Sequence, residues 1–74
     1  MKRIIQFKDG IIGGVVAQEV LTILPQLESS FTQRKTYFEY YFKATEVELT
    51  LEQLDKLSNE FRIKIDFDTI TIDE

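Results

Sequence analysis

The chain has 74 residues, a net charge of −4, and no His, Cys or Trp. The missing cysteines exclude disulfides, cysteine-ligated zinc and thiol catalysis, and the missing histidines remove the commonest metal ligand and general base. A hydrophobic content of 43% with one proline is typical of a single folded domain over residues 1–74 rather than a disordered tail. No segment approaches the roughly 20 apolar residues of a membrane span, so we expect a cytoplasmic protein without a membrane partner.

The first third of the chain predicts a strand and then a helix. Residues 2–7 carry β-prone apolar side chains and are followed by the turn-forming pair Asp9-Gly10. Apolar residues then recur at the spacing of one helix face: Ile12, Val15, Val16, Val20, Ile23, Leu24 and Leu27. Since Pro25 lacks an amide hydrogen, we expect the helix to end or kink just before it.

The next segment is unusually rich in rings, because five of the nine aromatic residues fall within six positions: Tyr37, Phe38, Tyr40, Tyr41 and Phe42. In a strand over 34–42, successive side chains alternate, so rings occupy both faces. A chain this short can cover one face with its own core but is not expected to cover the second. The outward-facing rings therefore indicate contact with a partner.

A change in the apolar alternation between Phe42 and Val47 predicts a turn near Ala44 and Thr45 that separates two strands. A bulge within one long strand is the alternative. Thr50 and Gln53 then fit a capping box, which predicts the start of a second helix. Its expected core face consists of Leu51, Leu54, Leu57 and Phe61.

The last segment reads as a strand buried on one side. The apolar residues at 61, 63, 65 and 67 alternate with charged ones, and the even-numbered side chains should face water. The apolar alternation changes again at Asp68-Thr69: the apolar residues of 61–67 are at odd positions, whereas Ile70 and Ile72 are at even positions. The tail is therefore expected either to bend or to pair elsewhere.

The order of elements, β-α-β-β-α-β, predicts a single α+β domain with the split βαβ arrangement. In it, two helices cover one face of a four-stranded antiparallel sheet and leave the other face open. This layout resembles the ferredoxin-like superfold, which includes RNA-recognition domains and amino-acid-sensing ACT domains. If residues 34–49 form one long strand instead, the sheet has three strands and an exposed edge.

The open face of such a sheet would gather basic and aromatic side chains, which makes it the candidate interaction face: Tyr37, Tyr41, Lys43, Arg62 and Lys64. One interpretation is a merely solvated surface, since Tyr and Lys suit exposed strands. Another is an interface with a protein partner or a second copy, with a homodimer expected, because Tyr is enriched in interfaces.

Stacking of single-stranded nucleic acid on Tyr37 and Tyr41 is a third interpretation. The RNA-recognition signature requires a glycine that the stretch 34–39 lacks, and Glu39 stands where an aromatic ring should stack. Its carboxylate would repel phosphate, so nucleic acid is a less favoured partner than protein.

The resemblance to ACT domains draws attention to the strand-to-helix junction, whose glycines could leave amides free for a carboxylate or phosphate. The candidate ligand loop is Asp9, Gly10, Gly13 and Gly14. Its spacing matches neither the dinucleotide fingerprint nor the P-loop, and a tight turn explains the glycines without a ligand.

Two pairs of carboxylates share a strand face, namely Asp66 with Asp68 and Glu46 with Glu48. Neither pair has partners that suggest a metal site or acid–base catalysis, so we expect no enzyme activity, no cofactor and no metal. The acidic second half of the chain could instead occupy a basic surface of another molecule. The favoured hypothesis is a small non-enzymatic interaction or regulatory protein that self-associates or docks a partner through the exposed aromatic sheet face or a strand edge.

Overall fold

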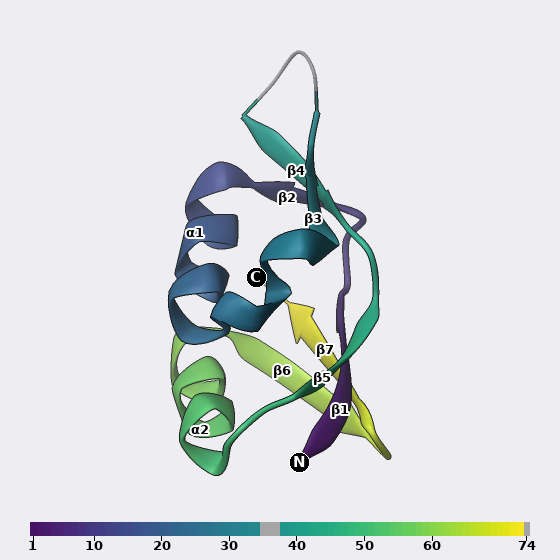
Figure 1. The fold of residues 1–74 in the computed structure, drawn as a ribbon, viewed down its shortest axis with the longest axis vertical. Coiled ribbons are helices and arrows are strands. Elements are labelled where there is room, and N and C mark those ends of the chain that lie inside the picture. The colour runs from purple at the N-terminus through teal and green to yellow at the C-terminus, as the bar shows by residue number, and fades with distance from the viewer. Residues whose placement is uncertain (35–37, 74) are drawn as a thin grey trace.

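The computed structural model describes residues 1–34 and 38–73, which form a small α+β protein with two sheets and two helices (Figure 1). The larger sheet has the strand order β5-β1-β7-β6. Its strands are β1 (Lys2–Phe7), β5 (Thr45–Glu48), β6 (Arg62–Asp66) and β7 (Thr69–Asp73). The central pair, β1 and β7, is parallel, and both outer pairs are antiparallel, so the sheet is mixed.

The second sheet is antiparallel, with β4 between β2 and β3. Its strands are β2 (Ile11–Gly13), β3 (Phe31–Gln33) and β4 (Glu39–Phe42). Both β2 and β3 are only three residues long, too short for a sequence alternation to reveal them. The expected aromatic strand over 34–42 is correct only for β4, and residues 35–37 lie outside the described residues.

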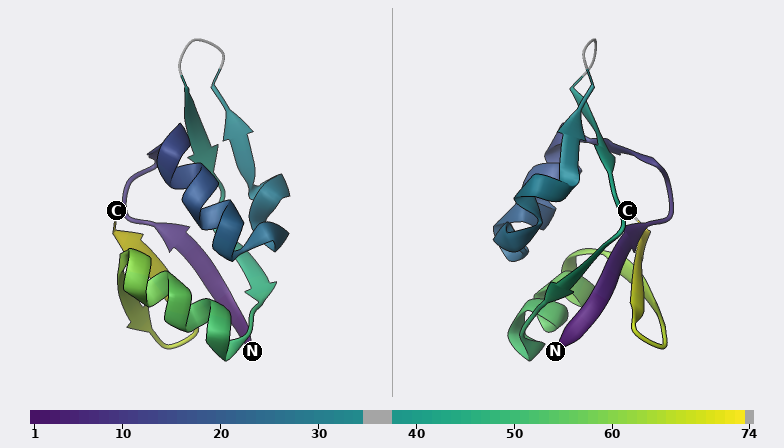
Figure 2. Two further views of the ribbon diagram at one scale, coloured as in Figure 1. Left: turned by 90° about the vertical axis from the view of Figure 1, so that its left-hand side faces the viewer. Right: turned by 45° about the vertical axis from the view of Figure 1, so that its right-hand side comes forward.

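The helices α1 (Gly14–Ile23) and α2 (Leu51–Glu60) lie on the same side of the two sheets (Figure 2). As expected, α1 ends before Pro25, which begins a 3₁₀ helix, η1 (Pro25–Ser30). The capping box of α2 is confirmed: the Gln53 amide donates to Thr50 Oγ1, and the Thr50 amide donates to Gln53 Oε1. Neither helix within the described residues is long and apolar enough to cross a membrane.

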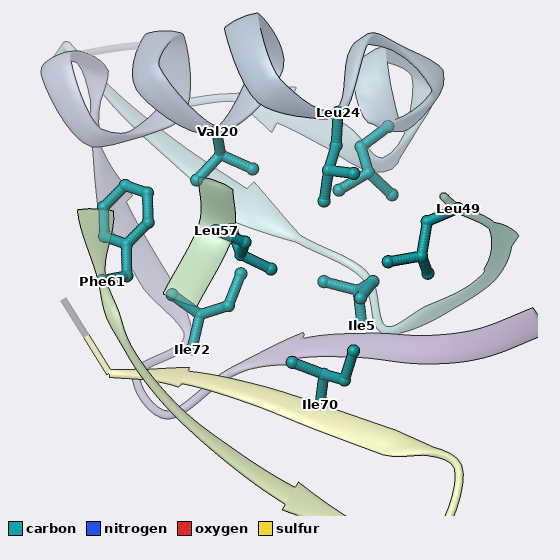
Figure 3. Packing of buried hydrophobic residues seen from close by; sticks show 9 residues of the cluster. Ile5, Val20, Leu24, Leu49, Leu57, Phe61, Ile70 and Ile72 are labelled. Atoms are coloured by element: carbon teal, nitrogen blue, oxygen red, sulfur yellow. The ribbon is translucent and has the colours of Figure 1, made fainter. Parts of the chain in front are cut away.

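The core lies between the two helices and the larger sheet (Figure 3). Fully buried side chains from α1 and the residue that follows it, from α2 and from the two central strands meet there: Val20, Leu24, Leu57, Ile5, Ile70 and Ile72. Burying each Leu or Ile stabilises the fold by about 1.5–3 kcal/mol. The C-terminal segment, whose pairing the sequence left open, is therefore strand β7, and its two isoleucines lie in the centre of the core.

The α+β class is confirmed, whereas the split βαβ arrangement is not. The expectation of an antiparallel sheet was wrong, because β7 inserts between β1 and β6 and runs parallel to β1. The change in apolar alternation at Asp68 is the turn of a hairpin in which Asp66 pairs with Thr69. Phe67 opens this two-residue loop with φ of 55°, a conformation usually left to Gly or Asn, so the sequence carries no standard turn signal there.

The turn expected near Ala44 and Thr45 is not a hairpin. Residues 43 and 44 connect β4 in one sheet to β5 in the other, and the two strands do not pair with each other. The change in apolar alternation therefore marks the point where the chain leaves the smaller sheet and enters the larger one. The core expectations for α2 need a similar correction, since Leu57 is buried but Leu51 is 74% exposed.

Candidate interaction surfaces

Tyr41 lies on the outer face of the smaller sheet, where its side chain is 49% exposed. Its register partners are Ile11 on β2 and Thr32 on β3, both of which are also exposed. The Arg34 guanidinium lies over the Tyr41 ring at 5.4 Å from its centroid and forms an ion pair with Glu39 at 3.2 Å. One side of the ring is therefore already in contact with a cation from the chain itself.

The other side of β4 is partly buried. Tyr40 and Phe42 point inward and form an aromatic cluster with Phe7 and Phe31, with ring centroids 4.8–6.2 Å apart. Edge-on and tilted contacts of this kind stabilise beyond the area that they bury. Among the described rings of this segment, Tyr40 and Phe42 thus serve folding, whereas Phe38 and Tyr41 are exposed and available for contact with another molecule.

The predicted interaction face is not one surface. Tyr41 belongs to the smaller sheet, Lys43 is an exposed residue between β4 and β5, and Arg62 and Lys64 lie on β6 at the edge of the larger sheet farthest from β5. Tyr37 lies outside the described residues. The prediction assumed a single sheet, and the passage at residues 43 and 44 divides its members between two sheets.

Sequence reasoning missed two exposed apolar residues beside this sheet. Phe38 is 88% exposed and Val15, in the first turn of α1, is 75% exposed. Both line an open groove of about 580 Å³ along α1, together with Gly14, Gln18, Glu19 and Thr22. The helical spacing places Val15 beside the core, but in the structure it falls outside the buried positions of the helix, 17 and 20.

In the candidate ligand loop, the two glycines nearest α1 already make backbone contacts with residues 38 and 39. The amide of Gly14 donates to the carbonyl of Phe38 at 3.0 Å, and Gly13 pairs with Glu39 in the sheet. A Cβ at position 14 would come within 3.3 Å of that carbonyl, so a close approach between α1 and β4 accounts for this glycine. Asp9 and Gly10 are exposed, and nothing lies within 4 Å of a Cβ built on Gly10.

The paired carboxylates do not gather into a site. Within residues 1–34 and 38–73, no group of three acidic side chains is placed to hold a metal ion. Glu48 accepts a hydrogen bond from the Met1 ammonium group at 2.8 Å, and this bond lowers the pKa of the carboxyl. The charges of the ammonium group and of Lys2 act in the same direction, against a desolvation that raises the pKa.

One further feature is the tip of the β6–β7 hairpin. Ile65 is 54% exposed on the edge strand, and Phe67 at the turn is 93% exposed. The alternation had assigned both to the core, but β6 extends past the cover that the helices provide.

The chain matches no protein-family model, and no curated protein or solved structure is significantly similar to it.

Proposed function

We propose that this protein is a small non-enzymatic interaction module that binds another protein. The proposal is carried by one observation: the exposed apolar side chains of Val15 and Phe38 line one open groove along α1, beside the β2–β4 pair, and we call this groove the β2–β4 surface. Ile11 and Tyr41 are also exposed on this pair, but on its outer face, away from α1. Exposed apolar groups gathered in this way are typical of contact sites between proteins.

The chemistry around this surface favours a partner segment that combines apolar and basic side chains. Glu19 borders the groove beside Val15, and Glu19 and Glu60 line the next hollow, which lies between α1 and α2. Lys56 also lines that hollow, but its ammonium group is paired with Glu52 at 3.3 Å. The whole chain carries a net charge of −4. Complementary charge accelerates association and selects among partners, while the rings supply the buried contact area.

The two alternatives have weaker support. For single-stranded nucleic acid, Tyr41 would need a ring face and nearby free cations, yet Arg34 already covers the ring and pairs with Glu39. For a small anionic ligand, the junction would need free amides, yet the Gly14 amide is donated to Phe38.

Capture from the native cell with the double variant Val15→Ser/Phe38→Ser tests the proposal. We expect the variant to fold and to lose at least about tenfold in recovered partner, since buried aromatic anchors dominate interface energetics. Leu51→Ser is the matched control, because it removes an equally exposed aliphatic side chain elsewhere, on α2. Equal recovery of the same proteins by the wild type and the double variant would refute the β2–β4 surface as the contact site.

A further inference from the structure

The free edge of β6 is the second unpartnered feature of the molecule. In the larger sheet β6 is the terminal strand, and among the described residues no strand pairs with its outer side. An open strand edge is a template for pairing with another chain, and proteins usually block such edges. The opposite edge is partly blocked, because the Gln26 side chain donates to the Glu48 carbonyl on β5 at 3.0 Å.

The hydrogen-bonding direction of each β6 residue follows from its neighbours. Ile4 and Lys8 donate to the carbonyls of Asp68 and Ile72, so the even-numbered carbonyls of β7 face β1. The odd-numbered residues of β7 therefore face β6, where their partners are Arg62, Lys64 and Asp66. It follows that the peptide groups of Ile63 and Ile65 point outward, to the open edge.

The charges along β6 are self-complementary in one antiparallel register. When Ile65 lies opposite Ile65 of a second copy, Lys64 of each copy lies opposite Asp66 of the other. Because β6 ends at Asp66, this register pairs residues 64–66 of the two copies, and Arg62 and Ile63 of each copy lie beside the turn of the other. Both charged side chains of the paired stretch then meet an opposite charge, and the exposed side chain of Ile65 lies against its counterpart.

The neighbouring registers lack this property. Centring the pair on Lys64 sets Arg62 opposite Asp66 but puts the two lysines directly opposite each other at the two-fold axis, and centring it on Ile63 puts Arg62 opposite Lys64. In the self-pairing of β5 that is centred on Val47, its charged residues Glu46 and Glu48 would oppose each other. Opposed like charges destabilise a strand pair, so the edge of β6 and the register at Ile65 are singled out.

We infer that two copies of this chain pair antiparallel along β6, with the two-fold axis at Ile65, to form one continuous eight-stranded sheet across the dimer. This inference rests on the proposed function, because it makes a second copy one of the protein partners of the module. It leaves the β2–β4 surface, beside the other sheet, available for a different protein.

Charge-reversal variants of the full chain test the register through mass in solution. Asp66→Lys sets two basic side chains opposite each other across the pair, and Lys64→Asp sets two acidic side chains opposite each other. Each variant alone is therefore expected to be monomeric where the wild type is dimeric. An equimolar mixture of the two restores both oppositely charged pairs, and we expect it to form a heterodimer. The double variant Lys64→Asp/Asp66→Lys should dimerise like the wild type.

Two further variants separate the edge from general effects. Ile65→Pro removes an amide that points away from β7, so it is expected to keep the hairpin and abolish the dimer. Glu46→Lys reverses a charge at the other edge of the same sheet and should leave the dimer intact. Circular dichroism on each variant shows that the fold is retained.

A wild-type chain that stays monomeric at millimolar concentration, or single charge variants that dimerise as well as the wild type, would overturn the inference. A mixture that fails to associate would exclude the register at Ile65. Failure of this inference and failure of the β2–β4 surface can be told apart. Val15→Ser/Phe38→Ser should dimerise normally, and Asp66→Lys should capture the partner of the β2–β4 surface normally.

Discussion

Gln53 connects the two helices, because its side-chain amide donates to the carbonyl of Ile23 at 3.1 Å. The same side chain accepts the Thr50 amide at 3.0 Å within the capping box. One residue thus closes the start of α2 and satisfies a carbonyl at the end of α1. The position of the second helix is tied to the first by this link as well as by the core.

Substitution of Gln53 separates these two roles. Gln53→Glu keeps the acceptor of the capping box but loses the donor to Ile23, whereas Gln53→Ala loses both. We expect Gln53→Ala to lower the free energy of unfolding by about 1–2 kcal/mol and Gln53→Glu by a smaller amount. Urea denaturation measures both values. A Gln53→Glu variant as stable as the wild type would show that the link to α1 contributes nothing.

Leu57 and Leu51 offer a direct comparison on one helix. Leu57 is fully buried, so Leu57→Ala should leave a cavity and cost about 2–5 kcal/mol. Leu51→Ala, at an exposed position, is expected to change stability by less than about 0.5 kcal/mol. Denaturation of the two variants side by side checks the prediction. Similar losses from both would mean that α2 packs with a different face toward the sheet.

Phe67 holds a positive φ that is costly for a bulky side chain. Phe67→Gly removes about 1–3 kcal/mol of backbone strain. Against this, the greater conformational entropy of glycine in the unfolded chain costs about 0.5–1 kcal/mol of stability. Because the ring is not buried in the monomer, we expect a net gain of stability, measured at a protein concentration low enough to exclude self-association. A destabilised monomer would contradict the assignment of strain.

The contact between Glu48 and the Met1 ammonium group predicts a pH dependence. The folded protein holds the pKa of Glu48 below its ordinary value of 4.5, so the contact stabilises the fold above that pH. Its contribution should disappear as the pH falls through the lowered value. Compared with the wild type, Glu48→Gln is therefore expected to be less stable at neutral pH and equally stable in strong acid. Thermal unfolding across the acid range measures the difference, and a gap that persists in strong acid would point to another cause.

The sequence determines the elements whose signals are local. The strand over 2–7 and the capping box at Thr50 were predicted from neighbouring residues and occur where expected. The break before Pro25 was also predicted, because a missing amide hydrogen acts on its own turn. The alternation of Tyr40 and Tyr41 between inside and outside follows in the same way from the geometry of one strand.

Only the tertiary structure decided which strands pair and which surfaces remain open. The pairing of β1 with β7 joins the two ends of the chain, and its parallel direction leaves no mark in either segment. A change in apolar alternation looks the same in the sequence whether the chain forms a hairpin, as at Phe67, or passes to another sheet, as at residues 43 and 44. Exposure of Phe38, Ile65 and Phe67 depends on where the helices stop covering the sheets, which is a property of the assembled chain and not of any short stretch of it.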